Sequence, residues 1–184
     1  MKKKISIMCM AFLLAVSLAP AQPVGAAEAP SQAKTAREEK LRSKCSAMSG
    51  PEALASAIHR VPAPGKNYRW DPAKADFTGY NPCRPFSWIV LRVAGATGSS
   101  PQQIMFFHYG QFVGRATKQA FGFSPTINRI APNQIKVTFT WAQNNEPNAK
   151  ASGKAESVYT LTGAGMKVRH SGQLPPGVEP VNEE

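Results

Sequence analysis

The sequence predicts a single α+β domain, in which an antiparallel meander sheet of about six strands follows one N-terminal helix. Two observations predict this fold. Between residues 86 and 163, short runs of alternating apolar and polar residues are separated by turn-forming residues, which is typical of half-buried antiparallel strands. Residues 49–61 instead carry apolar side chains at helical spacing. The domain is expected to span residues 48–162, about 115 residues, a normal size for one domain.

The helix is expected in SGPEALASAIHRV, residues 49–61. Ser49 is placed to cap it, Pro51 suits its first turn, and Glu52 is favourable near the positive end of the helix dipole. The apolar positions that recur at helical spacing are Leu54, Ala57, Ile58 and Val61. Because proline cannot continue a helix, Pro62 ends it.

The strands are expected in short segments joined by loops and tight turns. They lie in residues 86–95, in two strands within 102–117, and in residues 126–131, 134–142 and 154–163. The alternation is clearest in QIKVTFTWA, where every second residue from Ile135 to Trp141 is apolar. Tyr109-Gly110 and Pro132-Asn133 are the expected turns, since glycine and asparagine tolerate left-handed backbone conformations.

A long connection before the first strand, residues 65–82, is rich in aromatic side chains: Tyr68, Trp70, Phe77 and Tyr80. Connections of this length are usually functional or well packed. Two interpretations remain open. The aromatic side chains line a binding surface, or they pack against the sheet, which is the more common arrangement.

The ends of the chain are predicted to lie outside the domain. Residues 1–26 have a lysine-rich start, an apolar stretch and small residues before Ala27, the pattern of a cleaved signal peptide. The apolar stretch is shorter than the roughly 20 residues that a membrane span needs. Residues 27–47 are expected to be a polar spacer and residues 163–184 a Pro-rich flexible tail.

The charge of the chain favours anionic partners. The formal net charge is +11, and cleavage after residue 26 removes three lysines and no acids, which leaves +8. Such a charge attracts anionic surfaces over long distances. A nucleic-acid partner is not expected, because an exported protein does not meet one and no basic-aromatic motif is present.

The mature chain contains two cysteines, Cys45 and Cys83. An even number of cysteines in an oxidising compartment predicts a disulfide between them. A free thiol and a redox pair are the alternatives, but the chain has no C-x-x-C motif. The bridge would tie the entry of the first strand to the N-terminal segment.

No catalytic, cofactor-binding or metal-binding motif is evident in the sequence. Neither G-x-S-x-G nor H-E-x-x-H occurs. The three histidines, His59, His108 and His170, have no carboxylates at metal-ligand spacing. A small envelope hydrolase or transferase is the alternative function, and it needs His108 to lie near Asp71, Asp76 or Glu156.

Three motifs between Tyr80 and Gly114 resemble the LppP/LprE family of actinobacterial cell-envelope lipoproteins. They are the Y-x-P-C-x-x-x-S-W box (Tyr80, Pro82, Cys83, Ser87 and Trp88), the G-A-T-x-S-S-P loop (residues 95–101) and the F-F-H-x-G-x-F-x-G hairpin (residues 106–114). The resemblance extends in order from about Cys45 to Leu161.

The resemblance implies an exported cell-envelope protein, assigns no biochemical activity and carries over no catalytic residues. The lipid-accepting cysteine of the family's lipoproteins is missing here, so a secreted or wall-associated protein is expected. We expect a non-enzymatic binding or accessory module without a cofactor, whose partner is an envelope protein or an anionic cell-wall polymer. The residues expected on its ligand or partner surface are Trp70, Tyr80, Trp88 and His108.

Overall fold

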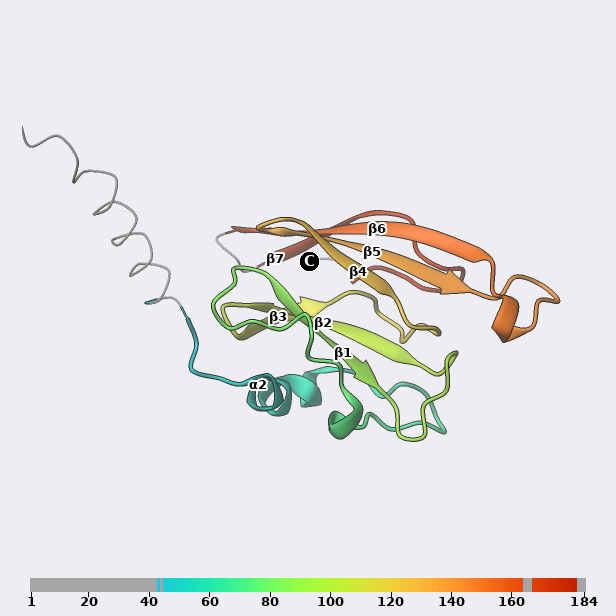
Figure 1. The fold of residues 1–184 in the computed structure, drawn as a ribbon, viewed down its shortest axis with the longest axis horizontal. Helices are drawn as coiled ribbons and strands as arrows, with labels where there is room; N and C mark the ends of the chain where they lie inside the picture. The colour runs from blue at the N-terminus through green and yellow to red at the C-terminus, as the bar shows by residue number, and fades with distance from the viewer. Residues whose placement is uncertain (1–42, 44, 164–166, 182–184) are drawn as a thin grey trace, which may run out of the picture.

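Two antiparallel sheets lie face to face, and helix α2 covers the outer face of the smaller sheet (Figure 1). This computed structural model describes residues 43, 45–163 and 167–181. The predicted signal peptide, residues 1–26, and most of the predicted spacer, residues 27–47, lie outside the described residues. The α+β class is confirmed.

Helix α2 (Gly50–Ala57) begins where the sequence predicts it. Ser49 is its N-cap: the Ser49 hydroxyl accepts the Glu52 N–H at 3.5 Å, and the Glu52 carboxylate accepts the Ser49 N–H at 2.7 Å. This reciprocal capping box satisfies two backbone donors that a helix N-terminus leaves unpaired. Ala53, Leu54 and Ala57 are buried against the sheet. Among the described residues, no helix is long and apolar enough to cross a membrane.

The smaller sheet contains β1 (Ser87–Arg92), β2 (Gln102–His108) and β3 (Gln111–Arg115), in the order β1-β2-β3. The predicted turn between β2 and β3 is confirmed, because Tyr109 and Gly110 have φ angles of 46° and 83°. Every residue of β2 except His108 is buried. A strand that is buried on both faces must lie between two cores, and β2 does.

The larger sheet contains four strands in the order β4-β5-β6-β7. They are β4 (Thr126–Ala131), β5 (Gln134–Trp141), β6 (Gly153–Thr162) and β7 (Lys167–Gly172). The prediction of one meander of about six strands is therefore wrong: the described residues form seven strands in two sheets. The physical reason is the apolar run of β2, which requires cover on both faces, whereas a single sheet with one helix leaves more of its area in water.

Two hydrophobic cores hold the layers together. The inter-sheet core is centred on Phe106, whose ring centroid lies 5.0 Å from that of Phe86 and 4.9 Å from that of Tyr159 in β6. The helix core lies on the other face of the smaller sheet, where Leu54 of α2 packs with Phe107. Successive residues of β2 thus point into different cores.

The expected flexible tail over residues 163–184 does not match the structure at residues 167–181. Lys167–Gly172 form β7, which pairs with β6. The following residues return to the smaller sheet, where the Lys118 N–H donates to the Glu179 carbonyl at 2.8 Å. Leu174 and Val178 pack against the inter-sheet core. The sequence predicts a flexible segment here because its composition is polar and Pro-rich, with few apolar residues. Leu174 and Val178 are nevertheless sufficient to anchor it, because they pack against a core formed by distant segments.

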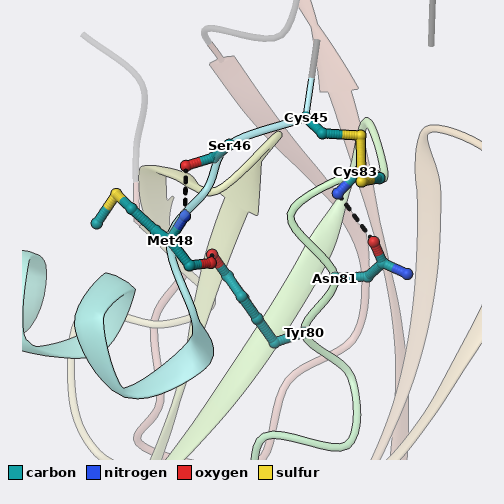
Figure 2. Close-up of a disulfide and its surroundings, with 6 residues drawn as sticks. All are labelled: Cys45, Ser46, Met48, Tyr80, Asn81 and Cys83. Carbon is teal, nitrogen blue, oxygen red and sulfur yellow. Dashed lines mark hydrogen bonds between the residues drawn. A yellow bond between two sulfur atoms is a disulfide. The ribbon is translucent and has the colours of Figure 1, made fainter. Parts of the chain in front are cut away.

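The predicted disulfide between Cys45 and Cys83 is confirmed (Figure 2). Two hydrogen bonds join the same segments: the Ser46 N–H donates to the Pro82 carbonyl at 3.2 Å, and the Tyr80 hydroxyl donates to the Met48 carbonyl at 3.0 Å. The bridge therefore fixes the segment before α2 to the entry of β1, as the sequence predicts.

Candidate functional site

The candidate functional site lies along β1 and β4, each of which is an edge strand of its own sheet. Two neighbouring hollows open there. The arginine groove, about 330 Å³, is lined by Arg84, Pro85, Arg129, Ile130, Ala131 and Pro132. The polar cavity, about 120 Å³, has a lining that includes Asp76, Thr78, Trp88, Arg92, Gln102 and Ser124.

The arginine groove brings together two positive charges that are far apart in the sequence. Arg84 comes from the loop before β1 and Arg129 from β4. Burial lowers the pKa of Arg129, and the positive charge of Arg84 lowers it further. Neither guanidinium forms an ion pair with a carboxylate of the described residues. A partly buried guanidinium beside an exposed one, neither of them paired with a carboxylate of the described residues, makes this groove favourable for an anion.

Trp88 connects the groove with the polar cavity. Its ring lies under the guanidinium of Arg129, whose Cζ atom is 5.5 Å from the ring centroid, within the range of a cation–π interaction. On another side, the indole lies so close to Gly79 that a Cβ atom there would overlap it. The backbone N–H of Trp88 also donates to the Gly79 carbonyl at 3.2 Å. The absence of a side chain at Gly79 therefore lets Trp88 occupy this position.

His108 reaches the arginine groove through Pro85. The His108 Nδ1 atom lies 2.6 Å from the Pro85 carbonyl oxygen, which only accepts hydrogen bonds, so Nδ1 carries a proton. His108 also borders an open pocket of about 480 Å³, together with Cys45, Met48 and Gln111. It therefore lies beside the groove and helps to hold Pro85 in the lining of the groove.

The polar cavity contains an ion pair and a buried amide. Arg92 Nη2 lies 3.5 Å from the Asp76 carboxylate, which also accepts hydrogen bonds from the Thr78 N–H at 2.9 Å and the Thr78 hydroxyl at 2.7 Å. The Gln102 amide nitrogen donates to the Ser124 hydroxyl at 3.1 Å. The cavity therefore offers donors and acceptors with little net charge.

Of the four side chains expected on the ligand surface, Trp88 and His108 lie next to the arginine groove but do not line it. Trp88 lines the polar cavity and packs under Arg129, and His108 contacts the Pro85 carbonyl. Trp70 and Tyr80 instead pack against the helix core, on the opposite face of the smaller sheet. The Trp70 indole donates to the Pro62 carbonyl at 2.8 Å, and the Tyr80 ring meets Phe107 edge-on. These two side chains follow the packing interpretation of the aromatic connection.

None of the three carboxylates considered for an enzyme contacts His108. The backbone of Asp76 pairs with Val90 of β1, and Val90 lies opposite Ile104 of β2. Ile104 is four residues from His108, a distance of about 13 Å along the strand. Asp71 caps the short 3-10 helix Pro72–Lys74, and Glu156 pairs with Lys136 at 2.9 Å on the larger sheet. Each carboxylate thus has another partner: Asp71 accepts a hydrogen bond from the Ala73 N–H, Asp76 pairs with Arg92, and Glu156 pairs with Lys136.

One serine–histidine pair was missed by the sequence analysis, because His170 lies in the predicted tail. The Ser157 hydroxyl lies 2.9 Å from His170 Nε2 and 2.6 Å from the carbonyl oxygen of Gln173. Since the carbonyl accepts the hydroxyl proton, Nε2 is left to donate to Ser157. Ser157 is fully buried. The pair therefore joins β6 to β7, and its serine hydroxyl is not accessible to a substrate.

The pair predicts a pH dependence of stability. Burial lowers the pKa of His170, which faces Ser157 and Tyr159. The unfolded chain therefore binds a proton near pH 6.5 that the folded chain does not yet bind, and the free energy of unfolding decreases as the pH falls from 6.5 to the lowered pKa. Urea unfolding between pH 8 and pH 5 should show this loss in the wild type and a smaller loss in His170→Gln. Equal losses would contradict the assignment.

Comparison with known proteins identifies the middle of the chain. No curated protein and no solved structure matches the sequence. A family model matches one segment of the chain, which includes β1 to β6 and both arginines of the arginine groove. This segment, residues 78–164, matches the model of the LppP/LprE lipoprotein family, the family that the motifs of this sequence resemble.

Proposed function

We propose that this protein is an exported cell-envelope protein and acts as a non-enzymatic binding module whose arginine groove holds an anionic group of an envelope partner. The observation that carries the proposal is the convergence of Arg84 and Arg129 without an ion-pair partner among the described residues. A guanidinium binds phosphate or carboxylate oxygens through two parallel N–H donors. The family match supports an envelope location.

The setting of Arg129 makes it suited to binding an anion. Arg129 is held in place by its contact with Trp88 and by a hydrogen bond from Nη1 to the Pro132 carbonyl at 3.3 Å. A side chain that is already ordered loses less conformational entropy when a ligand binds. The partial burial that lowers the pKa of Arg129 also strengthens its attraction for an anion, because less water screens the charge.

The partner that fits best is an anionic cell-wall polymer. A repeating polyanion is attracted by the formal net charge of +8 that remains after removal of residues 1–26, and one of its acidic groups then enters the groove. The contacts of Asp71, Asp76 and Glu156 favour this binding function over a hydrolase or transferase, since all three carboxylates have partners other than His108.

The test compares two double variants with the same change in charge. Arg84→Gln with Arg129→Gln removes both guanidinium groups of the groove. Arg69→Gln with Arg169→Gln removes two exposed arginines that lie outside it. Binding of purified mature protein to poly(glycerol phosphate) and to polygalacturonic acid is measured by calorimetry at fixed salt, and the two polymers distinguish phosphate from carboxylate.

The groove variant is expected to bind the preferred polymer roughly 100-fold more weakly, because each charge-assisted hydrogen bond contributes about 1.5–3 kcal/mol. The control variant should lose much less, since it changes only the long-range attraction. Equal losses in the two variants would show that net charge alone causes binding, and the groove would then have no specific role.

A further inference from the structure

The polar cavity is lined by residues with unsatisfied buried polar atoms. Among the described residues, four buried side-chain atoms have no hydrogen-bond partner, and two of them, Arg92 Nε and Gln102 Oε1, belong to residues that line this cavity. Arg92 and Gln102 lie directly opposite each other on β1 and β2. Gln102 is only 3% exposed. A buried polar atom without a partner costs about 1–3 kcal/mol, so a ligand or water is expected to bind here.

The chemistry of the two atoms selects a hydroxyl group. Arg92 Nε donates a hydrogen bond, whereas Gln102 Oε1 accepts one, and a hydroxyl does both. Asp76 offsets the charge of Arg92, so the cavity does not favour a second anion. Its volume of about 120 Å³ is the volume that about four water molecules occupy in liquid water. This space admits one hydroxyl-bearing edge of a larger molecule.

The cavity and the arginine groove lie along the same strand. Ile127 lines the cavity and Arg129 lines the groove, two residues further along β4, which corresponds to about 7 Å. Trp88 lies between them, because it lines the cavity and packs under Arg129. The apolar part of its indole offers a surface to the C–H groups that separate the hydroxyls of a sugar.

We propose that the polar cavity is a sugar subsite, which binds hydroxyl groups of a neutral sugar unit through Arg92 and Gln102. This inference deepens the proposed function and rests on it: the ligand is an anionic glycan, with an acidic group in the arginine groove and a neighbouring sugar in the cavity. A bound sugar hydroxyl would accept a hydrogen bond from Arg92 Nε and donate one to Gln102 Oε1, the two unpaired atoms.

The experiment uses neutral sugars, which do not depend on the arginine groove. Glucose, galactose and N-acetylglucosamine are titrated separately into ¹⁵N-labelled mature protein, and the indole N–H signal of Trp88 is followed by NMR, assigned with Trp88→Phe. At least one sugar is expected to shift this signal with a millimolar Kd, an affinity of about 4 kcal/mol. Absence of a shift with all three sugars at roughly 100 mM, about 100 times such a Kd, would overturn the proposal and leave the cavity to water.

Matched variants test the residues. Gln102→Leu removes the unpaired acceptor and is expected to weaken sugar binding at least tenfold. Gln134→Leu is its control, because Gln134 also donates to one hydroxyl, that of Thr160 at 3.2 Å, but does not line the cavity. Equal weakening in both would overturn the assignment. If Gln102→Leu does not fold, Asp76→Asn is used, since it keeps an oxygen for Thr78 and removes the charge beside Arg92.

The outcomes separate the two proposals. Sugar binding that depends on Gln102, together with polymer binding that does not depend on Arg84 and Arg129, would support the sugar subsite and reject the arginine groove. Polymer binding that depends on the two arginines, with no response to any neutral sugar, would support the groove and reject the subsite.

Discussion

Replacement of Phe106 by alanine is expected to lower the free energy of unfolding by about 3–5 kcal/mol, the usual cost of emptying a buried aromatic site. Phe106 is fully buried in the middle of β2. Its ring contacts Phe86, which directly precedes β1, and Tyr159 of the larger sheet, so the substitution would leave a cavity between the two sheets. Few positions contribute as directly to the contact between the layers.

Equilibrium unfolding in guanidinium chloride measures this loss. Ile130→Ala is the control, since this apolar side chain is 51% exposed and its truncation should change stability by much less. A loss below about 1.5 kcal/mol in Phe106→Ala would mean that the sheets are not held together through this ring. Because Ile130 lines the arginine groove, the control also reports whether the groove tolerates a change of its apolar wall.

Removal of the disulfide, by Cys45→Ser with Cys83→Ser, is expected to lower the free energy of unfolding by about 4 kcal/mol. The two cysteines are 38 residues apart, and the chain-entropy model gives this value for a closed loop of that length. Ser46 and Tyr80 would still bind their partners in the folded state. The effect therefore arises mainly from the larger conformational freedom of the unfolded chain.

The measurement compares both proteins with and without a reducing agent. Reduced wild type should unfold at the same denaturant concentration as the double variant, whereas the double variant should not respond to reduction. A difference of less than about 1 kcal/mol between wild type and variant would show that the loop is already restricted in the unfolded chain. Loss of affinity for the polymer without loss of stability would instead point to a direct role of the Cys45 segment, which borders His108.

The sequence by itself determined the local structure of this protein. Ser49 and Glu52 form the capping box, the alternation in residues 134–141 forms β5, and Tyr109-Gly110 forms the turn between β2 and β3. Each of these features depends on residues within a few positions of one another, so pattern and propensity are sufficient to predict them. The disulfide could be predicted as well, because only two cysteines are available after residue 26.

The tertiary structure alone decided how these elements pair and which side chains meet. β7 contains few apolar residues and gains its partners from β6, so its composition alone did not identify it. Arg84 and Arg129 meet because the loop before β1 lies beside the end of β4, and the pairing of Arg92 with Gln102 depends on the register of β1 and β2. Spacing along the chain carries no information about such contacts. They arise when apolar faces are buried together, and the charges at the sheet edges are then brought into one groove.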